Sequence, residues 1–156
     1  MASGWGPEGL IEAEVADGEA YHRALYLDGD LERPAGWHRD SVDRLIQLAI
    51  PHISEGSTIV DYGSGTGGSA IELLKALDES GIGVELILID PLPSWFGKAR
   101  EILEDREEVH LELSVGRDEN GRMKFRKLGE ILSGRKADVI ISSSTLHLIP
   151  ERAISG

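Results

Sequence analysis

The feature that most constrains this chain is a glycine-dense segment, Ile59 to Leu74, which reads IVDYGSGTGGSAIELL. A short apolar run ends in Asp61, a loop with four glycines follows, and a helix-forming run comes directly after that loop. A strand, a tight turn and a helix in immediate succession are the opening of a βαβ unit. Glycines allow positive φ angles and let a ligand approach the backbone without meeting a Cβ atom. The segment therefore predicts an α/β fold with a ligand-binding loop.

The loop Gly63 to Gly68 also satisfies G-x-G-x-x-G, the pattern that binds pyrophosphate in dinucleotide-binding folds. Asp61 helps to discriminate between ligands, because a carboxylate beside a bound pyrophosphate would repel it. The same carboxylate would be favourable beside an α-amino group or the amides of the loop. An NAD-dependent oxidoreductase thus stays open as an alternative, with Asp61 arguing against it.

The run Asp61-Tyr62-Gly63-Ser64-Gly65-Thr66-Gly67 resembles the first motif of the class I S-adenosylmethionine-dependent methyltransferases. In that family a strand ends in an acid, one residue follows, and G-x-G-x-G comes next. The resemblance covers about residues 57 to 150, the first four of the family's seven strands. It implies S-adenosylmethionine as cofactor and S-adenosylhomocysteine as product. It further implies that Asp61 orders the loop or meets the amino group, while the methionine end is cradled by Gly63, Ser64, Gly65 and Gly67.

The rest of the chain alternates between apolar runs and amphipathic stretches. This alternation predicts a doubly wound, mostly parallel sheet of four strands with flanking helices. Strands are expected at 57–62, 84–90, 109–115 and 137–143, and helices at 67–79, 94–105 and 124–132. An earlier helix is expected to begin at Asp40 or Ser41 and to run to Ile53. We thus expect an N-terminal arm with lid helices over 1–56 and a Rossmann-like domain over 57–156 whose C-terminal half is missing.

Asp90 closes the second expected strand beside the glycine loop. A carboxylate at this strand end can accept the hydroxyl protons of a ribose, which serves S-adenosylmethionine and NAD alike. One of the residues that follow, Pro91, Leu92 or Trp95, could pack on an adenine. The resemblance also places a residue from the turn after the third strand at the adenine amino group, and Asp118 is the candidate there.

The fourth expected strand ends in a run of small residues followed by a leucine and a histidine, which is similar to the corresponding stretch of the family. Strand ends at this edge face the ligand crevice. Ser142 and Ser143 are therefore expected near the methionine moiety or the reacting methyl group. His147 is the candidate general base, because its side chain titrates near neutral pH.

The composition of the chain limits the kinds of partner that it is expected to bind. The net charge is −12, which disfavours nucleic acid and anionic membranes. The chain has no cysteine, and its five histidines lack the spacing of metal ligands, so no metal site is expected. No apolar run approaches the length of a membrane span and the N-terminus carries no signal pattern, so a cytoplasmic location is expected.

The remaining expectations concern the acceptor and the partner. We expect a small-molecule methyl acceptor, methylated on O, N or C. The apolar fourth strand has one edge without a partner in the chain, and such an edge tends to pair with another molecule. It predicts a homodimer through that edge, or a half-domain that another chain completes. A non-catalytic, nucleoside-binding half-domain therefore stays open as an alternative to the enzyme.

Overall fold

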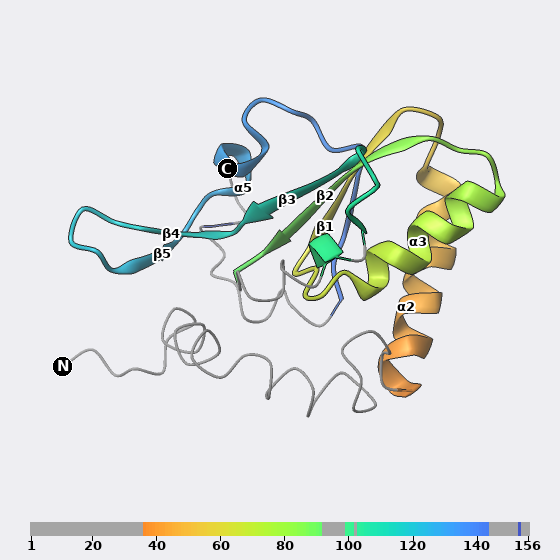
Figure 1. Cartoon of the computed structure of the whole chain (residues 1–156), viewed down its shortest axis with the longest axis horizontal. Helices are drawn as coiled ribbons and strands as arrows, with labels where there is room; N and C mark the ends of the chain where they lie inside the picture. The colour runs from red at the N-terminus through yellow and green to blue at the C-terminus, as the bar shows by residue number, and fades with distance from the viewer. Residues whose placement is uncertain (1–35, 92–98, 102, 144–152, 154–156) are drawn as a thin grey trace.

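The computed structural model describes residues 36–91, 99–101, 103–143 and 153. Its main sheet has four parallel strands in the order β3-β2-β1-β6, drawn in Figure 1. Along the chain this order is third, second, first, fourth, which matches the start of the doubly wound nucleotide-binding fold. The predicted fold class is confirmed. The strands are β1 (Ser57–Tyr62), β2 (Val84–Asp90), β3 (Val109–Leu113) and β6 (Val139–Ile141).

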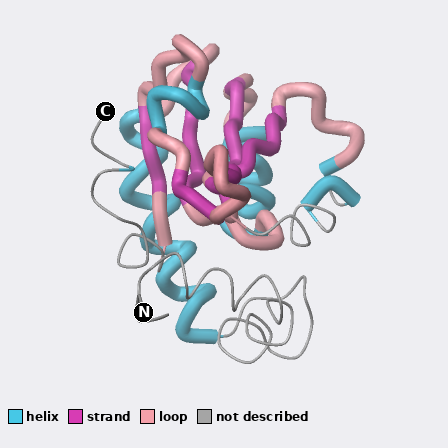
Figure 2. The backbone as a smooth tube through the Cα atoms, turned by 90° about the vertical axis from the view of Figure 1, so that its left-hand side faces the viewer, coloured by secondary structure: helices cyan, strands magenta, loops and turns pink. Residues whose placement is uncertain are grey.

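The two central strands are apolar on both faces because helices cover both faces of the sheet. Successive side chains point to opposite sides of a strand. Ile59 and Leu86 therefore join the core beneath helices α2 (Gly36–Ala49) and α3 (Gly68–Glu79). Val60 and Ile87 join the core beneath helix α5 (Leu128–Leu132). Figure 2 shows the strands side by side with helices packed around them. The carboxyl ends of the strands meet at one edge of the sheet, where the glycine loop lies.

Helix α3 (Gly68–Glu79) follows the loop directly, as predicted. Its buried residues repeat at helical spacing and face the sheet: Ala70, Leu73, Leu74 and Leu77.

Helix α2 spans Gly36–Ala49, so the predicted start at Asp40 or Ser41 is wrong. The three residues directly before Val42 (Arg39, Asp40 and Ser41) are polar and exposed, so they give no hydrophobic signal. The helix ends before Pro51, which cannot donate an interior helical hydrogen bond, and the short 3-10 helix η1 (Ile50–His52) follows.

The region after β3 departs most from the expectation. β3 ends at Leu113 rather than at residue 115, and an antiparallel hairpin follows, made of β4 (Val115–Arg117) and β5 (Met123–Phe125). The predicted helix over 124–132 is restricted to α5 (Leu128–Leu132), because Phe125 lies in a strand and packs against the α5 core. In Figure 1 the hairpin projects from the carboxyl end of β3.

Three further expectations are met in part or lie outside the description. β6 is shorter than the predicted strand over 137–143. Of the helix predicted over 94–105, residues 99–101 and 103 are helical, whereas 104 and 105 lie in a turn, so the predicted end is two residues too late. The division into an arm over 1–56 and a domain over 57–156 stays a prediction.

In the described part of the chain, no helix is both long and apolar enough to cross a membrane.

Candidate functional site

The loop after β1 is held against the end of β2 by backbone hydrogen bonds. The N–H groups of Gly63 and Ser64 both donate to the carbonyl oxygen of Ile89, at 2.7 and 3.1 Å. Gly63, Gly65 and Gly67 have φ angles of 83°, 57° and 90°, a region that favours glycine. The glycines are therefore needed for the backbone path from β1 into α3.

Gly67 lies at a packing contact. A Cβ atom at this position would lie 3.4 Å from Cβ of Ala99 and 3.6 Å from a side-chain carbon of Leu88, which are ordinary van der Waals distances. The start of α3 is therefore packed against β2 and the helical segment that contains Ala99, and Gly67 is required mainly by its positive φ angle.

Two buried carboxylates flank the loop. Asp90 is 2% exposed, and its Oδ2 accepts a hydrogen bond of 2.9 Å from the N–H of Gly65. Asp61 is also 2% exposed, and its Oδ2 accepts no hydrogen bond within the described part of the chain. Burial, and next the charge of Asp90, raise the pKa of Asp61 to about 7. The loop thus lies beside a carboxyl group whose burial favours its protonated form.

More polar groups without partners lie at the same sheet edge. The hydroxyl groups of Tyr62, Ser64 and Ser114 are buried, and none forms a hydrogen bond within the described residues. Burial, and next the charge of Asp90, raise the pKa of Tyr62. Buried polar atoms in proteins are nearly always hydrogen-bonded, so several exceptions at the carboxyl ends of β1 and β3 indicate a ligand site.

Sequence reasoning did not single out Tyr62 or Ser114. Tyr62 lies between Asp61 and the first glycine of the motif. An apolar side chain without a functional group would fit this position equally well, so nothing in the sequence indicated a site residue there. Ser114 follows the last residue of β3. Its position at a strand end was the available signal, since strand ends at this edge face ligands in such folds.

Three other predicted site residues follow the ends of β2 and β6. Pro91 is half-buried and follows Asp90 directly. Ser142 is half-buried just after β6, and its hydroxyl donates to the carbonyl oxygen of Tyr62 at 2.8 Å, which brings it to the edge that carries the loop. Ser143 is half-buried beside it. The described residues do not include Leu92, Trp95 or His147.

Asp118 is not brought together with Asp61 and Asp90. It lies in the turn of the β4–β5 hairpin, where its Oδ1 accepts hydrogen bonds of 2.9 Å from the N–H groups of Asn120 and Arg122. One oxygen of this carboxylate therefore stabilises the turn, and its role toward adenine stays a prediction. Among the described residues, no three His, Asp or Glu side chains lie close enough together to hold a metal ion.

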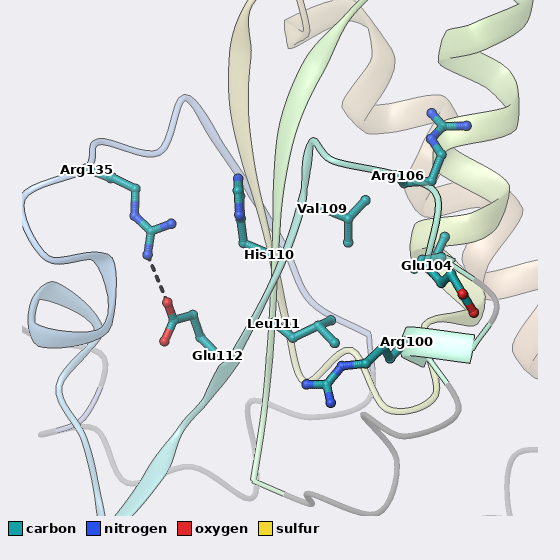
Figure 3. Close-up of a pocket in the computed structure, with 9 residues that line it drawn as sticks. Arg100, Glu104, Arg106, Val109, His110, Leu111, Glu112 and Arg135 are labelled. Carbon is teal, nitrogen blue, oxygen red and sulfur yellow. Dashed lines mark hydrogen bonds and ion pairs between the residues drawn. The ribbon is translucent and has the colours of Figure 1, made fainter.

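A pocket of about 380 Å³ lies elsewhere, along the outer edge of β3 (Figure 3). Arg100, Glu104 and Arg106 lie on one side of the strand, with His110, Glu112 and Arg135 on the other. Arg135 pairs with Glu112 at 3.1 Å and His110 with Glu85 at 2.5 Å. Paired charges along an edge strand hinder pairing with other chains. We therefore assign this pocket to the edge of the sheet and not to the loop site.

No protein-family model matches the sequence, and no curated protein matches it. Among solved structures, the chain is similar to the N-methyltransferase NodS from Bradyrhizobium japonicum, crystallised with S-adenosylhomocysteine. The identity is 15%, the TM-score 0.45, and the match covers 68% of this chain and 46% of that one. A methyltransferase from Geobacter sulfurreducens gives 18% identity, a TM-score of 0.44, and coverage of 68% and 37%.

The cyclase SpnF is also similar, with 16% identity, a TM-score of 0.48, and coverage of 69% of this chain and 42% of that one. The chain spans less than half the length of each of these three structures. Three features belong to the chain itself: the order of the four parallel strands, the glycine loop after β1, and an acid at or next to the last residue of β1 and β2. In these features its fold is similar to the N-terminal portion of the class I S-adenosylmethionine-dependent methyltransferases.

Proposed function

We propose that this chain forms the cofactor-binding portion of an S-adenosylmethionine-dependent methyltransferase that acts on a small-molecule acceptor. The observation that carries the proposal is the buried Asp61 carboxyl group, whose Oδ2 has no hydrogen-bond donor in the described part of the chain. It lies beside a glycine loop and near a second buried acid, Asp90. An unpaired buried carboxylate is unfavourable unless a cation or donor joins it.

S-adenosylmethionine fits these residues by charge and by donor groups. Its ammonium and sulfonium groups are positive, and its ribose carries two hydroxyl donors. Asp61 can meet the ammonium group, and Asp90 can accept ribose hydroxyl protons while Oδ2 keeps its bond to Gly65. A pyrophosphate would instead add negative charge beside two carboxylates, which disfavours NAD.

Bound S-adenosylmethionine supplies an activated methyl group and leaves as a neutral thioether. The protein must mainly hold donor and acceptor in line and exclude water, so proximity and orientation dominate. In this proposal Gly63, Ser64, Gly65 and Gly67 hold the methionine end. The adenine contacts are Pro91 and Asp118, and Ser142 and Ser143 lie near the reacting methyl group. His147 is the general base where the acceptor must lose a proton.

The test is calorimetric titration of the chain with S-adenosylmethionine, S-adenosylhomocysteine and NAD. We expect both sulfur nucleosides to bind the native chain and NAD not to bind. Asp90→Ala should abolish binding, because it removes the ribose acceptor and the partner of Gly65. Asp105→Asn is the matched control, since it removes one exposed negative charge outside the site. Binding of NAD alone would contradict the proposal and would indicate an NAD-dependent oxidoreductase instead.

A second candidate is a non-catalytic, nucleoside-binding half-domain that pairs with another chain. It is favoured by β6, which in the described part of the chain pairs only with β1. Ile140 in the middle of β6 is 52% exposed. We propose that a second copy pairs with this edge. A cytoplasmic location stays a prediction from the sequence.

The edge contact is tested by light scattering. The native chain should be a dimer and Ile140→Lys a monomer. Leu48→Lys is the control, because Leu48 is 57% exposed on α2 and lies outside the sheet. If the native chain is a monomer, the proposed homodimer is contradicted. If the chain transfers a methyl group to any acceptor of a panel, the non-catalytic alternative is contradicted.

A further inference from the structure

Positive charge is concentrated in one part of this acidic protein. Residues 115–136 hold seven of the sixteen Lys and Arg residues but only three of the twenty-eight Asp and Glu residues. This stretch includes the β4–β5 hairpin and α5. The rest of the chain is therefore more acidic than the net charge of −12 suggests.

The hairpin has one apolar and one polar face. Val115 lies opposite Phe125, and both pack into the core beneath α5, together with Met123. Gly116 lies opposite Lys124, which is exposed on the other face. The packing of the apolar face fixes the hairpin on the body of the protein and directs its basic face outward.

The turn of the hairpin is also fixed. Asp118 accepts two backbone hydrogen bonds within the turn, and the guanidinium group of Arg117 donates to the carbonyl oxygen of Gly121 at 2.8 Å. The cations of the hairpin are thus presented on a rigid support.

The cations of this protein differ in whether they form ion pairs. Lys75, Arg106 and Arg135 each form an ion pair with an acid. Arg122 and Lys124 are exposed and form no ion pair with any described residue. Unpaired cations on a rigid element are available to an anion from outside the protein.

The base of the hairpin is connected to the candidate site. The N–H of Ser114 donates to the carbonyl oxygen of Asp90 at 3.0 Å, and the N–H of Arg126 donates to the carbonyl oxygen of Ser114 at 2.9 Å. Asp90 is one of the two buried acids of the loop site. The basic hairpin therefore begins at the sheet edge where the cofactor is proposed to bind.

We propose that the β4–β5 hairpin recruits a methyl acceptor that carries a carboxylate or phosphate group. This inference rests on the proposed function. The acidic body of the protein repels anions, whereas residues 115–136, with seven cations against three acids, attract them within a screening length of about 10 Å. The two substrates are thus sorted by charge: the cationic cofactor toward Asp61 and Asp90, the anionic acceptor toward Arg122 and Lys124.

The test follows the backbone amide resonances of the isotope-labelled chain during titration with inorganic phosphate and with malonate, at constant ionic strength set by chloride. We expect saturable shifts at the hairpin amides. The double variant Arg122→Gln/Lys124→Gln should bind these anions about fivefold more weakly, since exposed charges contribute modestly. Arg44→Gln/Lys75→Gln removes the same charge from α2 and α3 and should bind as the native chain does.

The binding of phosphate is compared with the binding of malonate, and the tighter of the two indicates whether the acceptor carries a phosphate or a carboxylate group. Hairpin shifts that are missing, or equal in both double variants, overturn the proposal. Binding of a poly-glutamate peptide in place of both small anions also overturns it and indicates an acidic protein partner. S-adenosylhomocysteine is titrated into the same samples, so failure of the cofactor site is seen separately from failure of the hairpin.

Discussion

The N–H of Gly65 donates a hydrogen bond of 2.9 Å to Oδ2 of Asp90, twenty-five residues further along the chain. This bond ties the glycine loop to the end of β2. It also keeps a buried carboxylate near Asp61, whose pKa is raised by burial and by the charge of Asp90. Loop geometry and site electrostatics therefore depend on the same side chain.

Asp90→Asn separates these two effects. The amide oxygen can still accept the Gly65 N–H, but the negative charge is removed. The pKa of Asp61 should fall below about 7 and stay above 3.8, because burial, the larger cause, remains. The carboxyl carbon resonance of Asp61, followed against pH, measures this. Asp105→Asn should leave it unchanged, and an unaltered midpoint in Asp90→Asn would contradict the coupling.

Asp61→Asn should change how stability depends on pH. The pKa of Asp61 is 3.8 as a reference and about 7 when folded, so the folded state holds a proton that the unfolded chain releases. Its stabilising contribution is present below pH 3.8 and is lost as the pH rises to about 7. The variant should therefore gain stability over the native chain between pH 5 and pH 8, by on the order of 3 kcal/mol. Urea unfolding at both pH values measures this, and an equal difference at each would contradict it.

Gly67→Ala should destabilise the protein through backbone strain. The new Cβ would occupy a position with φ 90°, while its distances of 3.4 Å to Ala99 and 3.6 Å to Leu88 are ordinary van der Waals contacts. Gly56→Ala is the matched control, because Gly56 has φ 77° and open space around it. We expect a similar loss of about 1–2 kcal/mol for both variants in urea unfolding. A much larger loss for Gly67→Ala would contradict this and show that its neighbours cannot accommodate the Cβ atom.

Leu73→Ala tests the core between α3 and the sheet. Leu73 is fully buried, so its truncation should leave a cavity and lower the free energy of unfolding by about 2–5 kcal/mol. Leu48→Ala, at a site that is 57% exposed, should change it by less than about 0.5 kcal/mol. A similar small effect for both would mean that Leu73 is not part of a close-packed core.

The sequence predicted β1, α3 and β2 closely because their signals are local. Ile59 and Val60 form an apolar run, the glycines end it, and Leu73 and Leu77 repeat at helical spacing. The hairpin was missed because its pairing depends on Phe125 reaching the α5 core, a contact that periodicity does not encode. The strand register of Val115 opposite Phe125 is likewise set by that packing.

The candidate site was only partly predictable for the same reason. Asp61 and Asp90 were named from the ends of their strands, because parallel strands bring those ends together. The sequence could not tell that Oδ2 of Asp61 lacks a donor or that the hydroxyl of Tyr62 is buried without one. These properties depend on which atoms surround the side chain in three dimensions.

The shared acceptor at Ile89 has a consequence for the motion of the loop. Because the amides of Gly63 and Ser64 both donate to this one oxygen, they can open to solvent only when the end of β2 separates from β1. Their deuterium exchange should therefore be as slow as that of the sheet itself, although the segment is rich in glycine. A ligand then meets a loop that is already ordered, and its binding loses little conformational entropy.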